Sequence, residues 1–482
     1  MLNYVSTTGG GEAVDFETAI LNGYASDGGL YVPEQLPKID SAQLASWKGL
    51  SYKELAFEIL SLFIPRTAVP AEDLKGLLAQ AYADFYVEEI IPITKLASRK
   101  DTYIMELFHG PTISFKDIGM AFLVNLVDYF LAKRNEHLSL VVATTGDTGP
   151  AAAFYTAGKK HLDVWVLYPE GKITPEQERQ ITTLVASNVY PVSVANCTQG
   201  GDDLDAIIAK MYADPAFKAK LNISSVNSIN WGRVMMQTVH YFYGYLQLVE
   251  EIGTPINIAT PSGGFGNLGA GSLAREMGLP IQTFVAANNQ NACLHRIFEE
   301  GIFSLEPIVS TPASAIDILI PMNFWRYLYF KLKGDTNAIK EYKQVFDTVG
   351  SVRFKREHHR ILREGFSSYS VSDSETLAEM KQVFENEAYL LDPHAAVALQ
   401  AAKNADRVDA SLTTLCLATA HPAKFPEIVK EALTTEVLPE GATHFSIEKA
   451  AEACEKKLHC DLAYAQKALM AFMEENYTQK QS

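Results

Sequence analysis

The sequence predicts an α/β fold built on parallel sheets with crossover helices. From about residue 103, short runs rich in β-branched residues alternate with helical segments. Several of these runs are almost wholly apolar, as expected for strands that are covered on both faces. Alternation of strand and helix is typical of parallel sheets. In such folds, ligands bind at the carboxyl ends of the strands, beside helix N-termini.

The elements follow from hydrophobic periodicity and from the glycine and proline residues that punctuate it. The expected strands are Ser139–Ala143, Val164–Tyr168, Val189–Val194, Ile256–Ala259, Ile281–Ala286 and Leu412–Ala418. The helices expected between them are Asp117–Leu131, Pro175–Ala186, Asp203–Tyr212, Trp231–Glu251 and Leu268–Met277. Earlier in the chain we expect an extended piece at Leu30–Pro33 and amphipathic helices at Tyr52–Phe63 and Ala71–Tyr86.

The pattern divides the chain into three parts. Residues 1–95 form an N-terminal α+β extension, and residues 96–435 form a core of two α/β subdomains, the smaller at about 120–225. Within the core, residues 321–390 are expected to be mostly helical. Residues 436–482 are expected to form a helical tail, because apolar residues recur there at helical spacing. These residues are Ala450, Cys454, Leu458, Ala463, Leu469 and Phe472.

The composition narrows the partners and the compartment. The 482 residues include 41 Lys and Arg against 57 Asp and Glu, a formal net charge of −16. Neither nucleic acid nor an anionic membrane is expected as a partner, because both need a basic surface. The five scattered cysteines form no CxxC pair, which indicates free thiols and argues against a zinc site. With no secretory pattern and no long apolar run, we expect a cytoplasmic protein, either a monomer or a small homo-oligomer.

Lys116 is the first candidate for chemistry. It follows Phe115 and opens a strongly apolar helix. A helix N-terminus disfavours a cation, whereas a lysine that must be neutral to act as nucleophile or base gains from that field and from desolvation. A lone lysine is more often simply solvated, so the case for Lys116 depends on the motifs around it.

Two glycine-containing turns lie between a strand and a helix, where an anion can be cradled. The first spans 143–149 (Ala-Thr-Thr-Gly-Asp-Thr-Gly), and a tight turn without a ligand is an equal alternative for it. The second spans 261–269 and matches G-x-G-x-x-G at 264–269, which also allows a nucleotide-binding protein. Against a dinucleotide, this motif lies past the middle of the chain, and no acidic residue ends the next strand to bind a ribose hydroxyl.

Two further segments carry polar residues at a strand end or a helix start. In 226–233, Asn230 and Ser228 are plausible helix caps, but Arg233 places a cation in the first turn, a conflict that a bound anion would resolve. In 417–425, the Thr419 hydroxyl follows the last expected strand and is expected to face the cleft. His421, taken alone, would more often be a packed histidine than a catalyst.

Together these motifs resemble threonine synthases of the long-chain bacterial and fungal kind, within the tryptophan-synthase-β-like (fold type II) family of pyridoxal phosphate enzymes. The resemblance implies two parallel-sheet subdomains with an N-terminal extension domain, and pyridoxal phosphate as the cofactor. The matching stretches keep the family's order: Ala25–Pro33, Leu107–Asp117, Ala143–Gly149, Leu167–Ile173 with Pro175, Val226–Asn230, Pro261–Asn267, Leu391–Ala396 and Thr419–Phe425.

The resemblance also implies a role for each candidate. Lys116 would form a Schiff base with the cofactor and then act as base and acid, and Thr419 would bond the pyridine nitrogen. The cofactor phosphate would lie on Ser262, Gly263, Gly264, Phe265, Gly266 and Asn267. The residues implied to bind the substrate or to shape the cleft are Thr145, Gly146, Asp147, Thr148, Asn227, Ser228, Asn230, Arg233, His109 and Thr112. No metal is expected.

The implied reaction, a step of threonine biosynthesis, converts O-phospho-L-homoserine and water into L-threonine and phosphate. The sequence departs from the family pattern close to the reacting centre. Gly264 replaces a usual asparagine, Asn267 a usual acid, and Thr145 a usual serine. A related lyase that releases 2-oxobutyrate is therefore the first alternative. A cofactor-free binding module is disfavoured, because Lys116 and the anion-binding loops are all retained.

Overall fold

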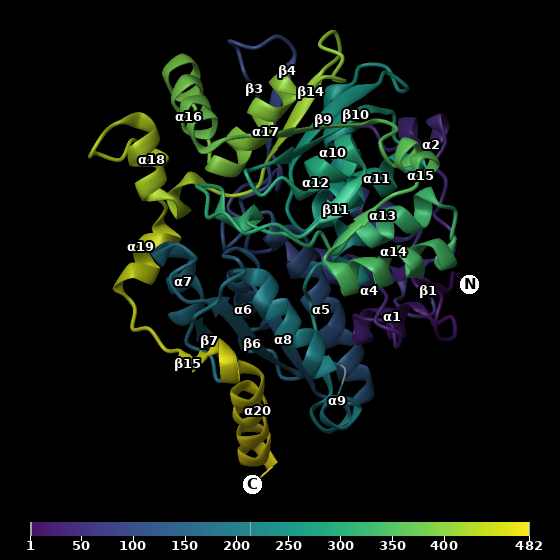
Figure 1. Ribbon diagram of the computed structural model, residues 1–482, viewed down its shortest axis with the longest axis vertical. Coiled ribbons are helices and arrows are strands. Elements are labelled where there is room, and N and C mark those ends of the chain that lie inside the picture. The colour runs from purple at the N-terminus through teal and green to yellow at the C-terminus, as the bar shows by residue number, and fades with distance from the viewer. Residues whose placement is uncertain (1, 213, 482) are drawn as a thin grey trace.

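The structure is a computed structural model that describes residues 2–212 and 214–481 (Figure 1). Within these residues, the larger sheet has six strands in the order β13-β10-β9-β14-β4-β3, parallel except for β3 against β4. Its strands are β3 (Ile93–Lys95), β4 (Thr102–Glu106), β9 (Ile256–Pro261), β10 (Ile281–Asn288), β13 (Phe366–Ser370) and β14 (Thr414–Ala418). The parallel α/β architecture expected from the sequence is confirmed.

The smaller sheet is parallel throughout and has five strands in the described residues, in the order β15-β7-β6-β5-β8. They are β5 (Leu138–Ala143), β6 (Leu162–Pro169), β7 (Val189–Ala195), β8 (Ile223–Ser224) and β15 (Leu458–Asp461). Every residue of β5 and β6 is buried, which explains why the two strands are apolar except for Ser139 and Asp163. Two antiparallel pairs lie outside the sheets: β1 (Tyr4–Ser6) with β2 (Tyr31–Pro33), and β11 (Ile302–Ser304) with β12 (Ser351–Arg353).

Helices precede and flank both sheets (Figure 1). The N-terminal segment contributes α1 (Phe16–Asn22), α2 (Ser41–Ser46), α3 (Tyr52–Leu60) and α4 (Ala71–Ala81). Those that follow are α5 (Lys116–Arg134), α6 (Thr148–Thr156), α7 (Pro175–Thr182), α8 (Gly201–Tyr212), α9 (Pro215–Leu221), α10 (Trp231–Leu248) and α11 (Gly266–Met277). Further along lie α12 (Cys293–His295), α13 (Phe324–Lys331), α14 (Thr336–Val349), α15 (Arg356–Leu362), α16 (Asp373–Glu387), α17 (Pro393–Asn404), α18 (Pro426–Leu433), α19 (Phe445–Glu452) and α20 (Ala465–Gln481).

Several expected helices end early. α3, α4, α7 and α10 each stop three to five residues before the expected limit. The reason is that buried residues such as Phe63 and Tyr82 continue the apolar pattern into the turns that follow a helix. No helix among the described residues combines the length and the apolar character that crossing a membrane requires.

Strands lie in two segments that the sequence predicts to be helical: β12 and β13 lie within residues 321–390, and β15 lies in the tail. The tail expected to be helical contains α19 and α20, but it also contains a strand, because Leu458–Asp461 form β15 and pair with β7. Its Cys460 is buried, and the strand is held by parallel pairing with β7 from Leu458 to Asp461. β13, within the segment expected to be mostly helical, carries three serines; Ser368 and Ser370 donate to Ala286 O (2.9 Å) and Asn289 O (3.0 Å), respectively.

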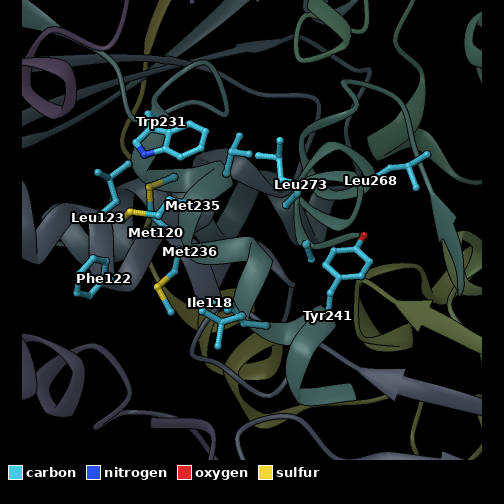
Figure 2. Packing of buried hydrophobic residues seen from close by; sticks show 14 of the residues in the cluster. Ile118, Met120, Phe122, Leu123, Trp231, Met235, Met236, Tyr241, Leu268 and Leu273 are labelled. Carbon is cyan, nitrogen blue, oxygen red and sulfur yellow. The ribbon is translucent and has the colours of Figure 1, made fainter. Parts of the chain in front are cut away.

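The core that supports the larger sheet is formed by α5, α10 and α11 (Figure 2). All residues of α10 from Trp231 to Leu246 are buried, as expected of a helix that is packed on every side. α11 approaches α10 closely at Gly271, where an added Cβ would lie 2.6 Å from the ring of Tyr241 and 2.9 Å from Phe284. This close approach requires glycine and fixes the position of the α11 N-terminus.

Two glycine substitutions within helices test this packing. Gly271→Ala is expected to lower the free energy of unfolding by about 1–3 kcal/mol, because the methyl group overpacks the α10–α11 contact. Gly76→Ala in α4 is the matched control: its added Cβ has no neighbour within 4 Å. The control is expected to raise the free energy of unfolding by about 0.5–1 kcal/mol. Urea denaturation of both variants measures the difference, and equal effects would contradict the packing argument.

Candidate active site

A cavity lies where the two sheets present the carboxyl ends of their strands. β5, β9 and β14 end at it, and the N-termini of α5, α6, α10 and α11 border it. This is the edge at which parallel sheets bind ligands. Fourteen predicted residues line the cavity: Lys116, Thr145, Asp147, Thr148, Asn227, Ser228, Arg233, Ser262, Gly263, Gly264, Phe265, Gly266, Asn267 and Thr419.

Lys116 is the first residue of α5 and is half-buried at the cavity wall. Its Nζ lies 4.0 Å from the centroid of the Phe115 ring. Burial lowers the pKa of Lys116 to about 7; the Asp147 carboxylate opposes this shift, and the cations Arg233 and Lys424 reinforce it. A large fraction of this amine is therefore neutral, and so nucleophilic, near neutral pH.

The loop before Lys116 is tied to the end of β14. Phe115 N donates to Thr419 O at 2.8 Å, and Ser114 and Ala420 form an isolated antiparallel bridge. Asp117 stabilises the same loop, because its carboxylate accepts hydrogen bonds from both Thr112 N (3.0 Å) and Thr112 Oγ1 (2.7 Å). These bonds fix the start of α5 relative to the Thr419 hydroxyl.

Four predicted residues do not line the cavity. Thr112 serves the loop just described, and His109 is paired with Glu106 at 2.7 Å. Asn230 caps α10 through Gly232 N and also donates to Ile20 O and Ser225 O. Gly146 has φ +135°, and an added Cβ would lie 2.3 Å from the Gln177 amide. We interpret all four as residues that hold the walls of the cavity in place.

The glycine loop after β9 is anchored by Phe265, which precedes α11 with φ +61°. A left-handed conformation is unfavourable for phenylalanine. Its ring is fully buried against Phe298, Phe324 and Tyr327, which compensates for this conformation. The loop is thereby held open toward the cavity, and at Gly264 an added Cβ would meet only Ile318, at 3.9 Å.

Asn267, in the first turn of α11, presents an unsatisfied donor. Its Oδ1 accepts from His240 Nε2 (2.8 Å) and from Tyr241 OH (3.0 Å). Burial lowers the pKa of His240 to about 4, so its ring is neutral. The Nδ2 of Asn267 is buried without a partner in the described part of the chain, and the residue lines the cavity. A buried orphan donor at a helix N-terminus suits an anion.

On the opposite wall, the departure at Thr145 is accommodated by a glycine. The Thr145 methyl carbon lies in the space left by the missing side chain of Gly201. A Cβ added at Gly201 would lie 2.4 Å from that methyl carbon. The Thr145 hydroxyl donates to Ala315 O at 3.3 Å. Asp147 also faces the cavity, but its carboxylate accepts from Gln177 Nε2 (3.0 Å) and pairs with Lys424 Nζ (2.7 Å).

The third wall comes from the segment before α10. Asn227 Nδ2 donates to Ala143 O (3.1 Å), and Ser228 Oγ accepts from Asn323 Nδ2 (2.8 Å). Arg233 is buried; its Nη1 donates to Val226 O (3.0 Å), while its Nε has no partner among the described residues. The charge of Arg233 therefore belongs to this wall of the cavity.

The sequence motifs did not assign roles to several residues at this site. Lys424 occurs within the last motif, and His394 within Leu391–Ala396. His394 Nε2 accepts from Ala315 N (3.1 Å), and Nδ1 bonds Asp392 Oδ1 (2.8 Å), which together hold the 313–318 loop at the cavity. Tyr24, Asp202 and Asp205 also line the cavity. The sequence around them shows no motif typical of phosphate binding or of a nucleophile. Burial and the neighbouring Asp202 raise the pKa of Asp205 to about 7.

The chain matches three families of known proteins. Residues 3–82 match the family described as threonine synthase N terminus, residues 88–420 the pyridoxal-phosphate dependent enzymes, and residues 395–461 the threonine synthase C-terminal family. The chain is 40% identical over 442 residues to threonine synthase-like 2 of Xenopus laevis, covering 91% of this chain and 92% of the relative. It is 36% identical over 478 residues to threonine synthase of Schizosaccharomyces pombe, with 91% and 92% covered.

Solved structures give the same result. The crystal structure of pyridoxal-phosphate-bound threonine synthase from Brucella melitensis has a TM-score of 0.89 and 33% identity, covering 99% of both chains. Yeast threonine synthase has a TM-score of 0.87 and 33% identity, also over 99% of both chains.

The chain is a pyridoxal-phosphate-dependent enzyme of fold type II. Within that class it belongs to the threonine synthase family, a family of lyases. The expected family, fold class and cofactor are thereby confirmed. The assignment also removes the reason for interpreting the 264–269 loop as a dinucleotide site.

The cavity fits pyridoxal phosphate. A lysine with a lowered pKa suits the aldehyde, the glycine loop with the orphan Nδ2 of Asn267 suits the phosphate, and Thr419 offers a neutral hydroxyl. We therefore propose Lys116, the 262–267 loop and Thr419 as the residues that hold the cofactor.

The first prediction for this site concerns Lys116. Pyridoxal phosphate is expected to give the full-length chain a yellow absorption band, and borohydride to fix the label on Lys116. Because only the neutral amine attacks, the rate of band formation should rise with pH through about 7 and level off above it. Lys116→Ala should abolish the band, whereas Lys53→Ala, at an exposed lysine of α3, should leave it unchanged. A label on any other lysine would refute the assignment.

The second prediction concerns the phosphate. Asn267→Ala removes the orphan donor and should weaken the binding of pyridoxal phosphate about 10-fold or more, as expected for a hydrogen bond to a charged group. Pyridoxal, which lacks the phosphate, is the matched ligand and should bind the variant and the parent chain equally. Titration of the absorption band with both ligands measures the effect, and equal losses for the two would show that Asn267 does not contact the phosphate.

Proposed function

We propose that this enzyme converts O-phospho-L-homoserine and water into L-threonine and inorganic phosphate. The observation that carries the proposal is the arrangement of Lys116 between two anion-ready walls. One wall is the glycine loop before α11, and the other consists of the loops before α6 and α10. A cofactor phosphate and a second anionic ligand can therefore be accommodated on different sides of the same amine.

When bound, pyridoxal phosphate supplies an electron sink that makes the hydrogens near the substrate amino group acidic. Lys116 then serves as the base. In the reaction, protons leave Cα and Cβ, phosphate leaves Cγ with the Cγ–oxygen bond, and the hydroxyl of water ends on Cβ. Protons return to Cα and to Cγ, which becomes the methyl group. A single amine that is neutral near pH 7 can accept and return these protons, because its two protonation states are close in free energy.

The substrate's two anionic groups need donors rather than carboxylates. Thr145, Thr148, Asn227 and Ser228 line the cavity at the N-termini of α6 and α10, where free amides and helix dipoles favour anions. Arg233, which lines the same wall, adds positive charge. We assign these residues to the substrate's carboxylate and phosphate. Asp147 acts differently, because its carboxylate is already paired with Lys424.

The alternative product, 2-oxobutyrate, is linked to the departures at Thr145 and Gly264. The fit of the Thr145 methyl group over Gly201 indicates that this threonine is accommodated without displacing its loop. The open space at Gly264 enlarges the cavity beside the glycine loop, which supports room for the attacking water. Relatives named threonine synthase and threonine synthase-like 2 are 36% and 40% identical to the chain, so product analysis is the decisive measurement.

The third prediction is the product itself. The holoenzyme incubated with O-phospho-L-homoserine should release threonine and phosphate in equal amounts. In water labelled with heavy oxygen, the label should enter the threonine hydroxyl and not the phosphate, because the Cγ–oxygen bond breaks. Lys116→Ala is the control without turnover. 2-Oxobutyrate as the main product would overturn the proposal in favour of the alternative lyase, and labelled phosphate would indicate simple hydrolysis.

A further inference from the structure

A second buried lysine lies close to the reactive one. Lys424 is 0% exposed and pairs through Nζ with Asp147 Oδ1 at 2.7 Å; the Asp147 side chain is 2% exposed. Lys424 Nζ also donates to Thr112 O (3.3 Å), and Gln177 Nε2 donates to the same Asp147 oxygen (3.0 Å). Although burial alone would raise it, the Lys424 ammonium holds the pKa of Asp147 below its ordinary value. Asp147 is therefore a buried, charged carboxylate.

The pair joins the two halves of the site. Asp147 lies between β5 of the smaller sheet and α6, in the same loop as Thr145. Lys424 lies in the short helix Pro422–Lys424 after β14 of the larger sheet, five residues beyond Thr419. A second contact supports it, because Thr174 Oγ1 donates to Lys424 O at 3.0 Å.

An unpaired carboxylate here would harm the reactive amine. Asp147 interacts electrostatically with Lys116 and favours its charged form. We propose that Lys424 is a positioning residue that holds and neutralises the Asp147 carboxylate, so that the Lys116 amine stays uncharged and free to react. This inference rests on the proposed function of Lys116. Lys424 favours the neutral Lys116 amine in two ways. Its own charge repels a Lys116 ammonium, and its pairing with Asp147 screens the carboxylate that would stabilise that ammonium.

Other charged groups near the pair do not replace Lys424. Arg233 acts directly on Lys116, and Asp117 faces Lys424 and Arg233. His394 also acts electrostatically on Asp147, but its ring is held by Asp392 and Ala315. His421 lies directly before the Pro422–Lys424 helix. Burial lowers the pKa of His421 to about 4, and the charge of Lys424 acts in the same direction. Asp202 and Asp205 line the same cavity.

Trace acylation of the full-length chain, before pyridoxal phosphate is added, tests the proposal. The labelling rate of Lys116 is followed by mass spectrometry from acidic to alkaline pH. The midpoint, the pH at which this rate is half of its maximum, reports where the amine becomes neutral. Lys424→Met should raise the midpoint by about one to three pH units. Asp147→Asn should lower it, and the double variant should return it close to that of the parent chain. Lys424→Arg keeps the charge and should restore most of the parent midpoint.

The order of midpoints separates an electrostatic role from a structural one. A merely structural role predicts that both single variants shift the midpoint in the same direction, or not at all, and either result overturns the proposal. If Lys424→Met does not fold by circular dichroism, Asp147→Asn and the double variant decide: an unchanged midpoint in Asp147→Asn, or no return in the double variant, also overturns it. The midpoint is measured without substrate, so the result stands even if the enzyme does not form threonine. Conversely, if the midpoints fall in the wrong order, threonine formation does not save the inference about Lys424.

Discussion

An amine that attacks a carbonyl must be uncharged, and the site is arranged around this requirement at Lys116. Burial at the start of α5, the positive end of the helix dipole and the nearby Arg233 all disfavour its ammonium form. The Asp147 carboxylate, which acts in the opposite sense, is held in a pair with Lys424. The site therefore combines a buried charge pair with a cavity lined mainly by hydroxyls, amides and glycine backbone.

Different elements support the loops on the two sides of the cavity. The glycine loop is set by α11, which packs against α10 at Gly271 and is anchored through the buried ring of Phe265. The loop with Thr145 and Asp147 belongs to the smaller sheet and is joined to the larger one through Lys424 and Thr174. The proposed cofactor wall and the proposed substrate wall are therefore built from different elements, which suits a reaction in which one ligand stays bound and the other is exchanged.

The sequence predicted the strand-to-helix loops well, because each combines an apolar strand with glycine, hydroxyl and amide residues directly after it. It gave no role to Lys424 or His394, since their partners Asp147 and Ala315 are distant in the chain and meet only in the fold. It placed Asn230 and Thr112 among possible ligands, although their polar groups serve a helix cap and a loop. The strands β13 and β15 escaped prediction because one is rich in serine and the other has only four residues.

β15 has a consequence for how the chain is made. It completes the edge of the smaller sheet beside β7, yet it is separated from β7 by more than 260 residues of sequence. During synthesis, β7 leaves the ribosome long before its neighbour, with the backbone groups of one edge unpaired. An open edge of this kind is a template for association with other chains. The smaller sheet therefore reaches its final form only after residues 458–461 have left the ribosome, and the edge of β7 has to be protected from other chains until then.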